Sequence, residues 1–352
     1  MAHAEVLFDE RFARDLRRKW RGYVTFPDVW AVLRGRSAAQ RNLRAWLEEQ
    51  WQSIPPRAKR ASLRGDLRSE NMDPPQHMGA RFELAVRAWL LRVSPRVTVE
   101  PKLPGTARRP DFRVWLGPGQ SFVVECIARS PSPGLADALC SRAVQHTLER
   151  LLRAEHPLLL RRWSLAVRLS PWQAVSARQV RQLAQLIASE AQRSRASQLR
   201  LPLAPVGLRG EVVLCRGRRP APHAPEGPEQ AADFVLARAA QKLARFAPFV
   251  NQPFLVAVNQ QMLGQWNDRV FAQRWRAVAP TFAPALSALC LCTAQELPDR
   301  LRFCFSVYHN PAAAHPLPRR WLPPCAHYVR YGARWRWLRT GEGVLDCLPA
   351  AR

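Results

Sequence analysis

Three carboxylate side chains between residues 77 and 129 are the groups in this chain best placed to do chemistry. Glu83 falls in an expected helix, and Asp111 and Glu125 fall in two expected strands that follow it. Carboxylate oxygens are preferred ligands of Mg²⁺, which can activate water and stabilise the negative charge that develops on a phosphodiester during hydrolysis. We expect Asp111 and Glu125 to be metal ligands, and Glu83 to support the metal or the attacking water.

The helix expected over 77–93 would place Glu83 on its apolar side. Apolar residues recur there at helical spacing, and Glu83 projects within ~20° of Leu90 because the two lie seven residues apart. A carboxylate in that position needs a partner. The metal site is one candidate, and an i,i+4 ion pair with Arg87 is the other.

Short strands separated by turn sequences would carry the other two carboxylates. We expect strands at 96–101, 110–116 and 121–128, separated by PGTARRP and GPG. Side chains alternate along a strand, so Asp111 shares a face with Arg113, and Glu125 shares a face with Ile127. Pairing through the GPG turn would bring Asp111 and Glu125 together, although each could instead neutralise a neighbouring arginine.

This arrangement resembles the PD-(D/E)xK, or restriction-endonuclease-like, superfamily. The matching residues are Glu83, Pro110–Asp111 and Glu125, and the order helix, three strands, helix, strand over 77–170 is similar to that superfamily's core. The resemblance implies a magnesium-dependent nuclease. The segments PGTARRPDF, FVVEC, PFLVAVN and HNPAAAHPLP are also similar to a family of bacterial proteins, a resemblance that implies no particular activity.

The chain departs from the superfamily's pattern at Ile127, where the resemblance places a lysine two residues after Glu125. Loss of one preorganised donor costs on the order of 10²–10³ in rate. Arg113 could stabilise charge, but guanidinium cannot act as a base. Lys242 lies at the margin of a later helix's apolar face, within ~20° of Val235, and could reach the site or rest its stem on the core. With no substitute cation, the chain would be a non-catalytic nucleic-acid-binding or assembly protein on the same fold.

The charge of the chain is strongly unbalanced, with 54 basic against 27 acidic residues and a pI near 11.4. Such an excess indicates an anionic partner such as nucleic acid or an acidic membrane surface, and we expect DNA or RNA. The arginines expected to contact nucleic-acid phosphates are Arg14, Arg17, Arg18, Arg108 and Arg109. Only four of the basic residues are lysines, so a compositional bias towards arginine and a solvated helix face are the alternatives.

Composition divides the expected α/β fold into three regions. Residues 1–73 are predicted to be a basic, helical N-terminal extension, 77–170 the restriction-endonuclease-like core, and 171–352 an α/β continuation that packs on the core. Trp46 and Trp51 recur at helical spacing, which favours a core position. No apolar run reaches the ~20 residues that span a bilayer, and the scattered cysteines indicate buried thiols, so we expect a cytoplasmic protein without membrane contact.

Overall fold

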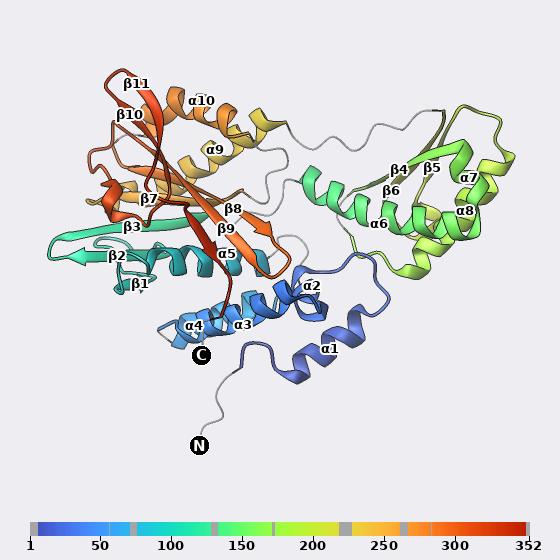
Figure 1. Cartoon of the computed structure of the whole chain (residues 1–352), viewed down its shortest axis with the longest axis horizontal. Coiled ribbons are helices and arrows are strands. Elements are labelled where there is room, and N and C mark those ends of the chain that lie inside the picture. Colours follow the sequence, from blue (N-terminus) through green and yellow to red (C-terminus); the bar gives the residue numbers. More distant parts are fainter. Residues whose placement is uncertain are drawn as a thin grey trace.

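The computed structural model describes residues 6–55, 57–70, 76–127, 133–170, 173–217, 227–260, 267–282 and 284–349. Within these residues the protein has a mixed α/β architecture, with a nine-stranded mixed sheet and a separate three-stranded sheet (Figure 1). Short 3₁₀ helices are η1 (Ala204–Val206), η2 (Ala247–Phe249), η4 (Ala279–Phe282) and η5 (Arg319–Trp321).

The large sheet contains the strands on which the acidic residues were expected. In sheet order its strands are β1 (Val97–Val99), β2 (Phe112–Gly117), β3 (Gln120–Ile127), β7 (Phe254–Asn259), β8 (Ala288–Glu296), β9 (Leu301–His309), β10 (Ala326–Tyr331) and β11 (Arg334–Arg339), with β12 (Val344–Asp346) beside β9. β1, β2 and β3 form an antiparallel meander, and β7 lies parallel to β3. Nearly every residue of β3 and β7 is buried and most are apolar, as expected of central strands covered on both faces.

Helices cover both faces of this sheet (Figure 1). One face packs against α3 (Ala38–Gln52), α4 (Arg57–Leu67) and α5 (Gln76–Leu90), and the other against α9 (Pro228–Phe246) and α10 (Asp268–Val278). Trp46 and Trp51 are 3% and 1% exposed in the first core, which confirms the position predicted from their spacing. The N-terminal helices α3 and α4 therefore belong to the main hydrophobic core.

A second unit is inserted between β3 and α9 and forms a lobe of its own (Figure 1). Its elements are α6 (Pro133–Glu155), α7 (Pro157–Arg162), β4 (Trp163–Leu169), α8 (Ala177–Arg193), β5 (Gln198–Pro202) and β6 (Gly210–Arg216). β4 pairs with β6 along its whole length, and its apolar side chains pack against α6 and α8. This lobe has a separate hydrophobic core.

The inserted lobe changes the strand order that the sequence predicted. The strand expected at 161–170 is β4, and it lies in the three-stranded sheet rather than beside β3. β7 occupies the position next to β3, so the large sheet extends from the predicted core range 77–170 into the predicted continuation 171–352. The physical reason is that β4 finds an antiparallel partner in β6 and buries its apolar face within the lobe.

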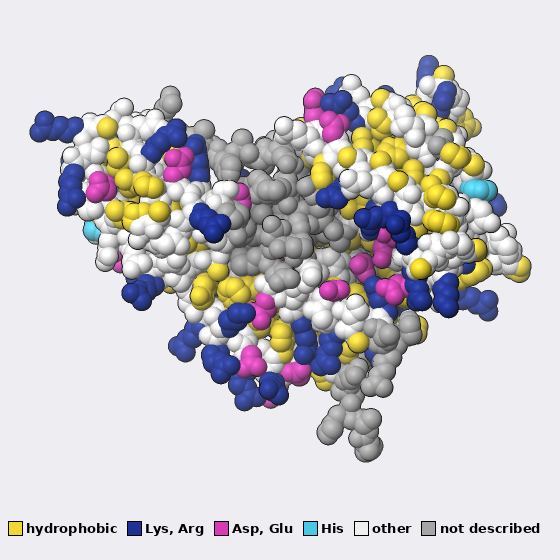
Figure 2. Space-filling view, turned by 180° about the vertical axis from the view of Figure 1, so that it is seen from behind, with side chains coloured by type: hydrophobic (Ala, Val, Ile, Leu, Met, Phe, Trp, Pro, Cys, Tyr) yellow, Lys and Arg dark blue, Asp and Glu magenta, His cyan; other side chains and the backbone are white. Residues whose placement is uncertain are grey.

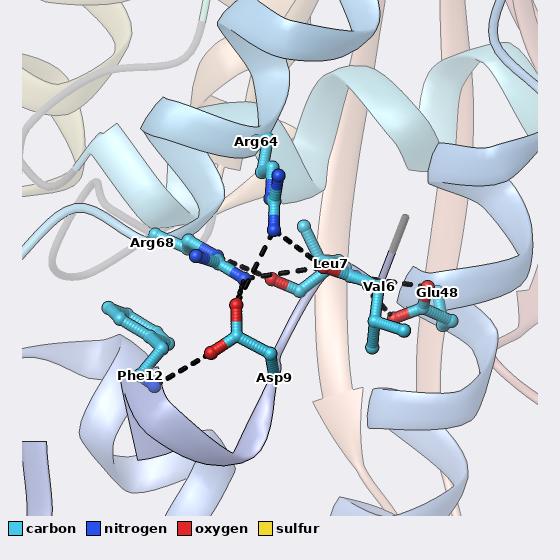
Figure 3. Close-up of polar contacts among 7 residues, drawn as sticks. All are labelled: Val6, Leu7, Asp9, Phe12, Glu48, Arg64 and Arg68. Carbon is cyan, nitrogen blue, oxygen red and sulfur yellow. Dashed lines mark hydrogen bonds and ion pairs between the residues drawn. The ribbon is translucent and has the colours of Figure 1, made fainter. Parts of the chain in front are cut away.

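The chain before α3 is fixed to the core by polar contacts with α3 and α4 (Figure 3). α1 (Glu10–Trp20) begins at Asp9, whose carboxylate caps the helix by accepting the Phe12 N–H at 2.8 Å. The same carboxylate pairs with Arg68 at 2.6 Å and Arg64 at 3.4 Å. α2 (Asp28–Arg34) follows and packs against α1 and α3. These contacts set the position of α1 relative to α4.

Candidate active site

The strand pairing places two of the predicted acidic residues opposite each other. β2 and β3 pair with Phe112 opposite Val124, and continuing this register by one residue puts Asp111 opposite Glu125. Opposed side chains on one sheet face have Cβ atoms about 4.5–5.5 Å apart. Asp111 Oδ2 also accepts a 2.6 Å hydrogen bond from the backbone N–H of Cys126, which orients the carboxylate towards β3.

Glu125 is the most buried acid of this group, at 4% exposed. Its Oε1 forms an ion pair with the ammonium of Lys242 on α9. Its Oε2 is buried and has no hydrogen-bond partner among the described residues. Burial and the neighbouring Asp111 raise the pKa of Glu125 to about 7, although Lys242 opposes the shift. One carboxylate oxygen therefore remains available inside a site that already holds a cation.

The other two acids of the group interact electrostatically with each other. Burial raises the pKa of Asp111 above its usual value, while the Cys126 N–H and then Lys242 oppose the rise. Burial and then Asp111 raise the pKa of Glu83 to about 8. Neighbouring carboxylates in a low-dielectric site resist full ionisation, so the group favours an added positive charge.

Two residues that the sequence analysis did not identify complete the cluster. Lys59 of α4 lies 3.4 Å from Glu83 Oε2 and 3.0 Å from Glu100 Oε1. Burial alone would lower the pKa of Lys59, but Glu83, Glu100 and Asp111 together raise it. Glu100 has φ +46°, the single non-glycine positive φ within the described ranges, and its N–H donates to the Asp111 carbonyl at 2.9 Å. Strained backbone of this kind concentrates at functional sites.

The rarity of lysine in this chain was a signal that could have identified Lys59. The chain has only four lysines among 54 basic residues, and two of the four lie in this cluster. Lys59 is separated from Glu83 by a proline-containing linker, so no periodicity relates the two positions. The choice of lysine over arginine in an arginine-rich chain could have drawn attention to Lys59 as well as to Lys242.

The predicted arginine contacts are not part of the cluster. The Arg113 guanidinium lies over the Trp115 ring, 5.2 Å from its centroid, and in the described part of the chain it makes no ion pair with the carboxylates. Arg87 donates to the Ser53 hydroxyl and carbonyl at 2.8 and 3.0 Å. Its guanidinium therefore binds Ser53 rather than forming the ion pair with Glu83 that was the alternative expectation. Of the arginines expected to contact phosphates, Arg108 and Arg109 are exposed in the loop before Asp111, and Arg14, Arg17 and Arg18 are exposed on α1.

The cluster has both a buried and a solvent-accessible side. The side chains of Glu125 and Lys59 are 5% and 12% exposed, whereas those of Glu83 and Lys242 are 24% and 29% exposed. Ile127 is 5% exposed and packs in the apolar core that includes α9 and α10. A ligand could therefore approach the acids from the side of Glu83 and Lys242.

The residues present are suited to a hard divalent cation with few protein ligands. The unpartnered Oε2 of Glu125, opposite Asp111, supplies the oxygen chemistry that Mg²⁺ prefers. Magnesium usually retains several waters and needs only one or two carboxylates. No set of three or more His, Cys, Asp or Glu side chains is grouped as metal ligands within the described ranges.

Comparisons with known proteins do not identify a relative. The chain matches no protein-family model, no curated protein and no solved structure. Among the described helices, none has the length and apolar character that crossing a bilayer requires.

Proposed function

We propose that this protein is a magnesium-dependent phosphodiester hydrolase that acts on nucleic acid, built on a restriction-endonuclease-like core. The observation that carries the proposal is the buried Glu125, which faces Asp111, pairs with Lys242 and keeps one oxygen without a partner. The order α5, β1, β2, β3, α9, β7, with β3 parallel to β7, supports the same core once the inserted lobe is set aside. The net charge of +27 supports a polyanionic substrate.

In this proposal the acids and lysines have separate roles. Asp111 and Glu125 hold the magnesium ion, which when bound supplies positive charge at the phosphate and acidifies water. Lys242 keeps positive charge beside Glu125 and stabilises the charge that develops on the phosphate. Glu83, whose pKa is about 8, can take up or release a proton near neutral pH and orients the water. Lys59 positions Glu83 through their ion pair.

Lys242 also accounts for the departure at Ile127. A lysine at position 127 would be buried in the apolar core, because Ile127 is 5% exposed there. A cation delivered from α9 reaches Glu125 without that cost. We infer that α9 supplies the cation that the resemblance places on β3.

Metal binding is the direct test of this proposal. Isothermal titration of the protein with MgCl₂ or MnCl₂ should show uptake that Asp111→Asn abolishes and Asp15→Asn, at a side chain 55% exposed on α1, leaves intact. Cleavage of labelled DNA and RNA should fall by about 10²-fold or more in Asp111→Asn. Absence of both metal uptake and cleavage in the unmodified protein would overturn the proposal.

One observation favours a second candidate, a non-catalytic nucleic-acid-binding protein. Lys242 and Lys59 already neutralise the acids by ion pairs, so the cluster has partial charge balance without a metal. Nucleic-acid binding that is strong in EDTA, together with no magnesium uptake, would identify this alternative.

A further inference from the structure

A pocket lined by arginines lies between α1, α2 and α3, apart from the acidic cluster. Its volume is about 750 Å³. Its charged lining residues are all arginines: Arg17, Arg21, Arg34, Arg36, Arg41 and Arg44. Figure 2 shows basic side chains gathered on the part of the molecule formed by the N-terminal helices. Six like charges without an acid in the lining favour a bound anion.

Arg41 and Arg44 of this pocket donate to backbone carbonyls, and Arg34 lies over a phenylalanine ring, whereas the other three arginines are unused among the described residues. Within the described ranges, the guanidinium groups of Arg17, Arg21 and Arg36 make no hydrogen bond or ion pair. Trp30 also lines the pocket, is 7% exposed, and has an indole N–H without a hydrogen-bond partner among the described residues. Guanidinium groups match the geometry of phosphate oxygens and form paired, charge-assisted hydrogen bonds with them. The pocket is therefore suited to phosphate rather than to an apolar ligand.

Arg44 holds the pocket in shape. Its guanidinium donates to the carbonyls of Val32 at 2.7 Å and Gly35 at 2.9 Å, which ties α3 to the end of α2. Burial and the neighbouring Arg41 lower the pKa of Arg44, as expected where cations crowd together. The exposed arginines are thus presented by a fixed frame.

α4 connects this pocket to the acidic cluster. At one end of the helix, Lys59 pairs with Glu83. Just beyond the other end, Glu70 accepts a 2.5 Å hydrogen bond from the indole of Trp20, which lines the pocket. α4 itself spans about 16 Å, at ~1.5 Å rise over its 11 residues. A strand that contacts both the pocket and the acidic cluster would therefore need several nucleotides, at the ~3.4 Å rise of a stacked strand.

We propose that the arginine pocket binds phosphate groups of a nucleic-acid strand, several nucleotides from the phosphodiester held at Asp111 and Glu125. Phosphate binding follows from the pocket alone, whereas the spacing rests on the proposed function of the acidic cluster. The phosphates could belong to the backbone or to a strand end, since both present the same oxygens.

The test measures binding of labelled single-stranded oligonucleotides to the full chain with Asp111→Asn, in EDTA, so that no cleavage occurs. Lengthening the strand from 4 to 12 nucleotides should raise affinity roughly 10–100-fold, because added phosphates reach the pocket. Arg34→Gln with Arg36→Gln should remove that gain and lower the slope of log affinity against log salt by about 1.4, at ~0.7 per phosphate contact. Circular dichroism melting checks that the variants remain folded.

A matched pair on the inserted lobe serves as the control. Arg193→Gln with Arg195→Gln removes two exposed arginines at the C-terminal end of α8 and just after it, and should leave both the gain and the slope unchanged. Oligonucleotides with and without a 5′-phosphate separate the two sources of phosphate. If Arg34→Gln with Arg36→Gln lowers the affinity for both strands equally, the pocket contacts the backbone. If it lowers the affinity for the phosphorylated strand alone, the pocket binds a strand end. The proposal would be overturned if the affinity gain and the salt slope persisted in Arg34→Gln with Arg36→Gln. It would also be overturned if the protein bound inorganic phosphate but no oligonucleotide. Failure of the unmodified protein to cleave would count against the proposed function and leave this result standing.

Discussion

Replacing Lys242 with methionine should destabilise the protein by an amount that grows with pH. Glu125 is 4% exposed and the Lys242 side chain is 29% exposed, so the ion pair is mostly but not fully buried. Breaking a fully buried pair costs about 3–5 kcal/mol, and solvent access at the lysine reduces this to about 1–3 kcal/mol. Methionine keeps most of the apolar stem, so the change reports chiefly on charge.

The sign of the pH dependence follows from Glu125. Its pKa is about 7 in the folded protein, above its ordinary value, so the folded state favours the neutral carboxyl and loses stability as pH rises through 7. Without Lys242 that pKa rises further. The destabilisation caused by Lys242→Met should therefore be larger at about pH 8.5 than at about pH 6, by about 1–2 kcal/mol at ~1.36 kcal/mol per pH unit.

Guanidinium unfolding in EDTA at the two pH values measures this difference. Lys19→Met is the control, because Lys19 pairs with Glu70 at 2.9 Å while its side chain is 60% exposed, and its removal should cost no more than about 0.5 kcal/mol at either pH. Under the proposed function, Lys242→Met should also lower cleavage by about 10²–10³-fold. Equal destabilisation at both pH values, or a cost no larger than that of Lys19→Met, would refute the reasoning.

Three further outcomes are expected. Ile127→Lys should destabilise the protein by about 3 kcal/mol or more, since it buries a charged ammonium in an apolar core, and a denaturation midpoint equal to that of the parent would contradict this. His309 and His327 lie 3.0 Å apart through their ring nitrogens, and burial lowers their pKa values to about 3 and about 4. Below pH ~6.5 these histidines bind protons in the unfolded chain but stay neutral in the folded protein. The free energy of unfolding should therefore fall as the pH drops, by about 2 kcal/mol per histidine at pH 5. His327→Gln should make this fall in stability smaller. A free energy of unfolding that stays constant from pH 7 to pH 5 in the parent would contradict the prediction. Gly343→Ala places a Cβ 2.7 Å from a backbone oxygen at φ +65°, and should lower the melting temperature more than Gly119→Ala, which has φ +69° and open space.

Local sequence signals predicted the elements around the acids well. The helix expected over 77–93 and the strands expected at 110–116 and 121–128 correspond to α5, β2 and β3 within a few residues. Strand partners were not predictable in the same way. β4 and β7 are both short apolar strands that follow a helix, and only packing between distant segments decides which of them joins β3.

The residues of the site also fall into those that local sequence signals could place and those that depend on contacts between distant segments. Period-two alternation and the GPG turn were sufficient to expect Asp111 opposite Glu125, because that pairing is local. Lys242 could be singled out only as an unusual residue at a helix margin, since the loop geometry that brings α9 to β3 leaves no local signal. Lys59 and Glu100 were missed because one belongs to a helix beyond a linker and the other to a strained backbone position that its residue type does not favour.

The parallel pairing of β3 with β7 has a consequence for synthesis on the ribosome. Paired residues such as Val123 and Phe254 are about 130 residues apart, because the inserted lobe lies between them. At ~5–20 residues per second, roughly 7–26 s pass between the emergence of the two strands. During that interval an apolar strand edge awaits its neighbour, and a chaperone that shields nascent chains, or early closure of the lobe, would protect it from aggregation.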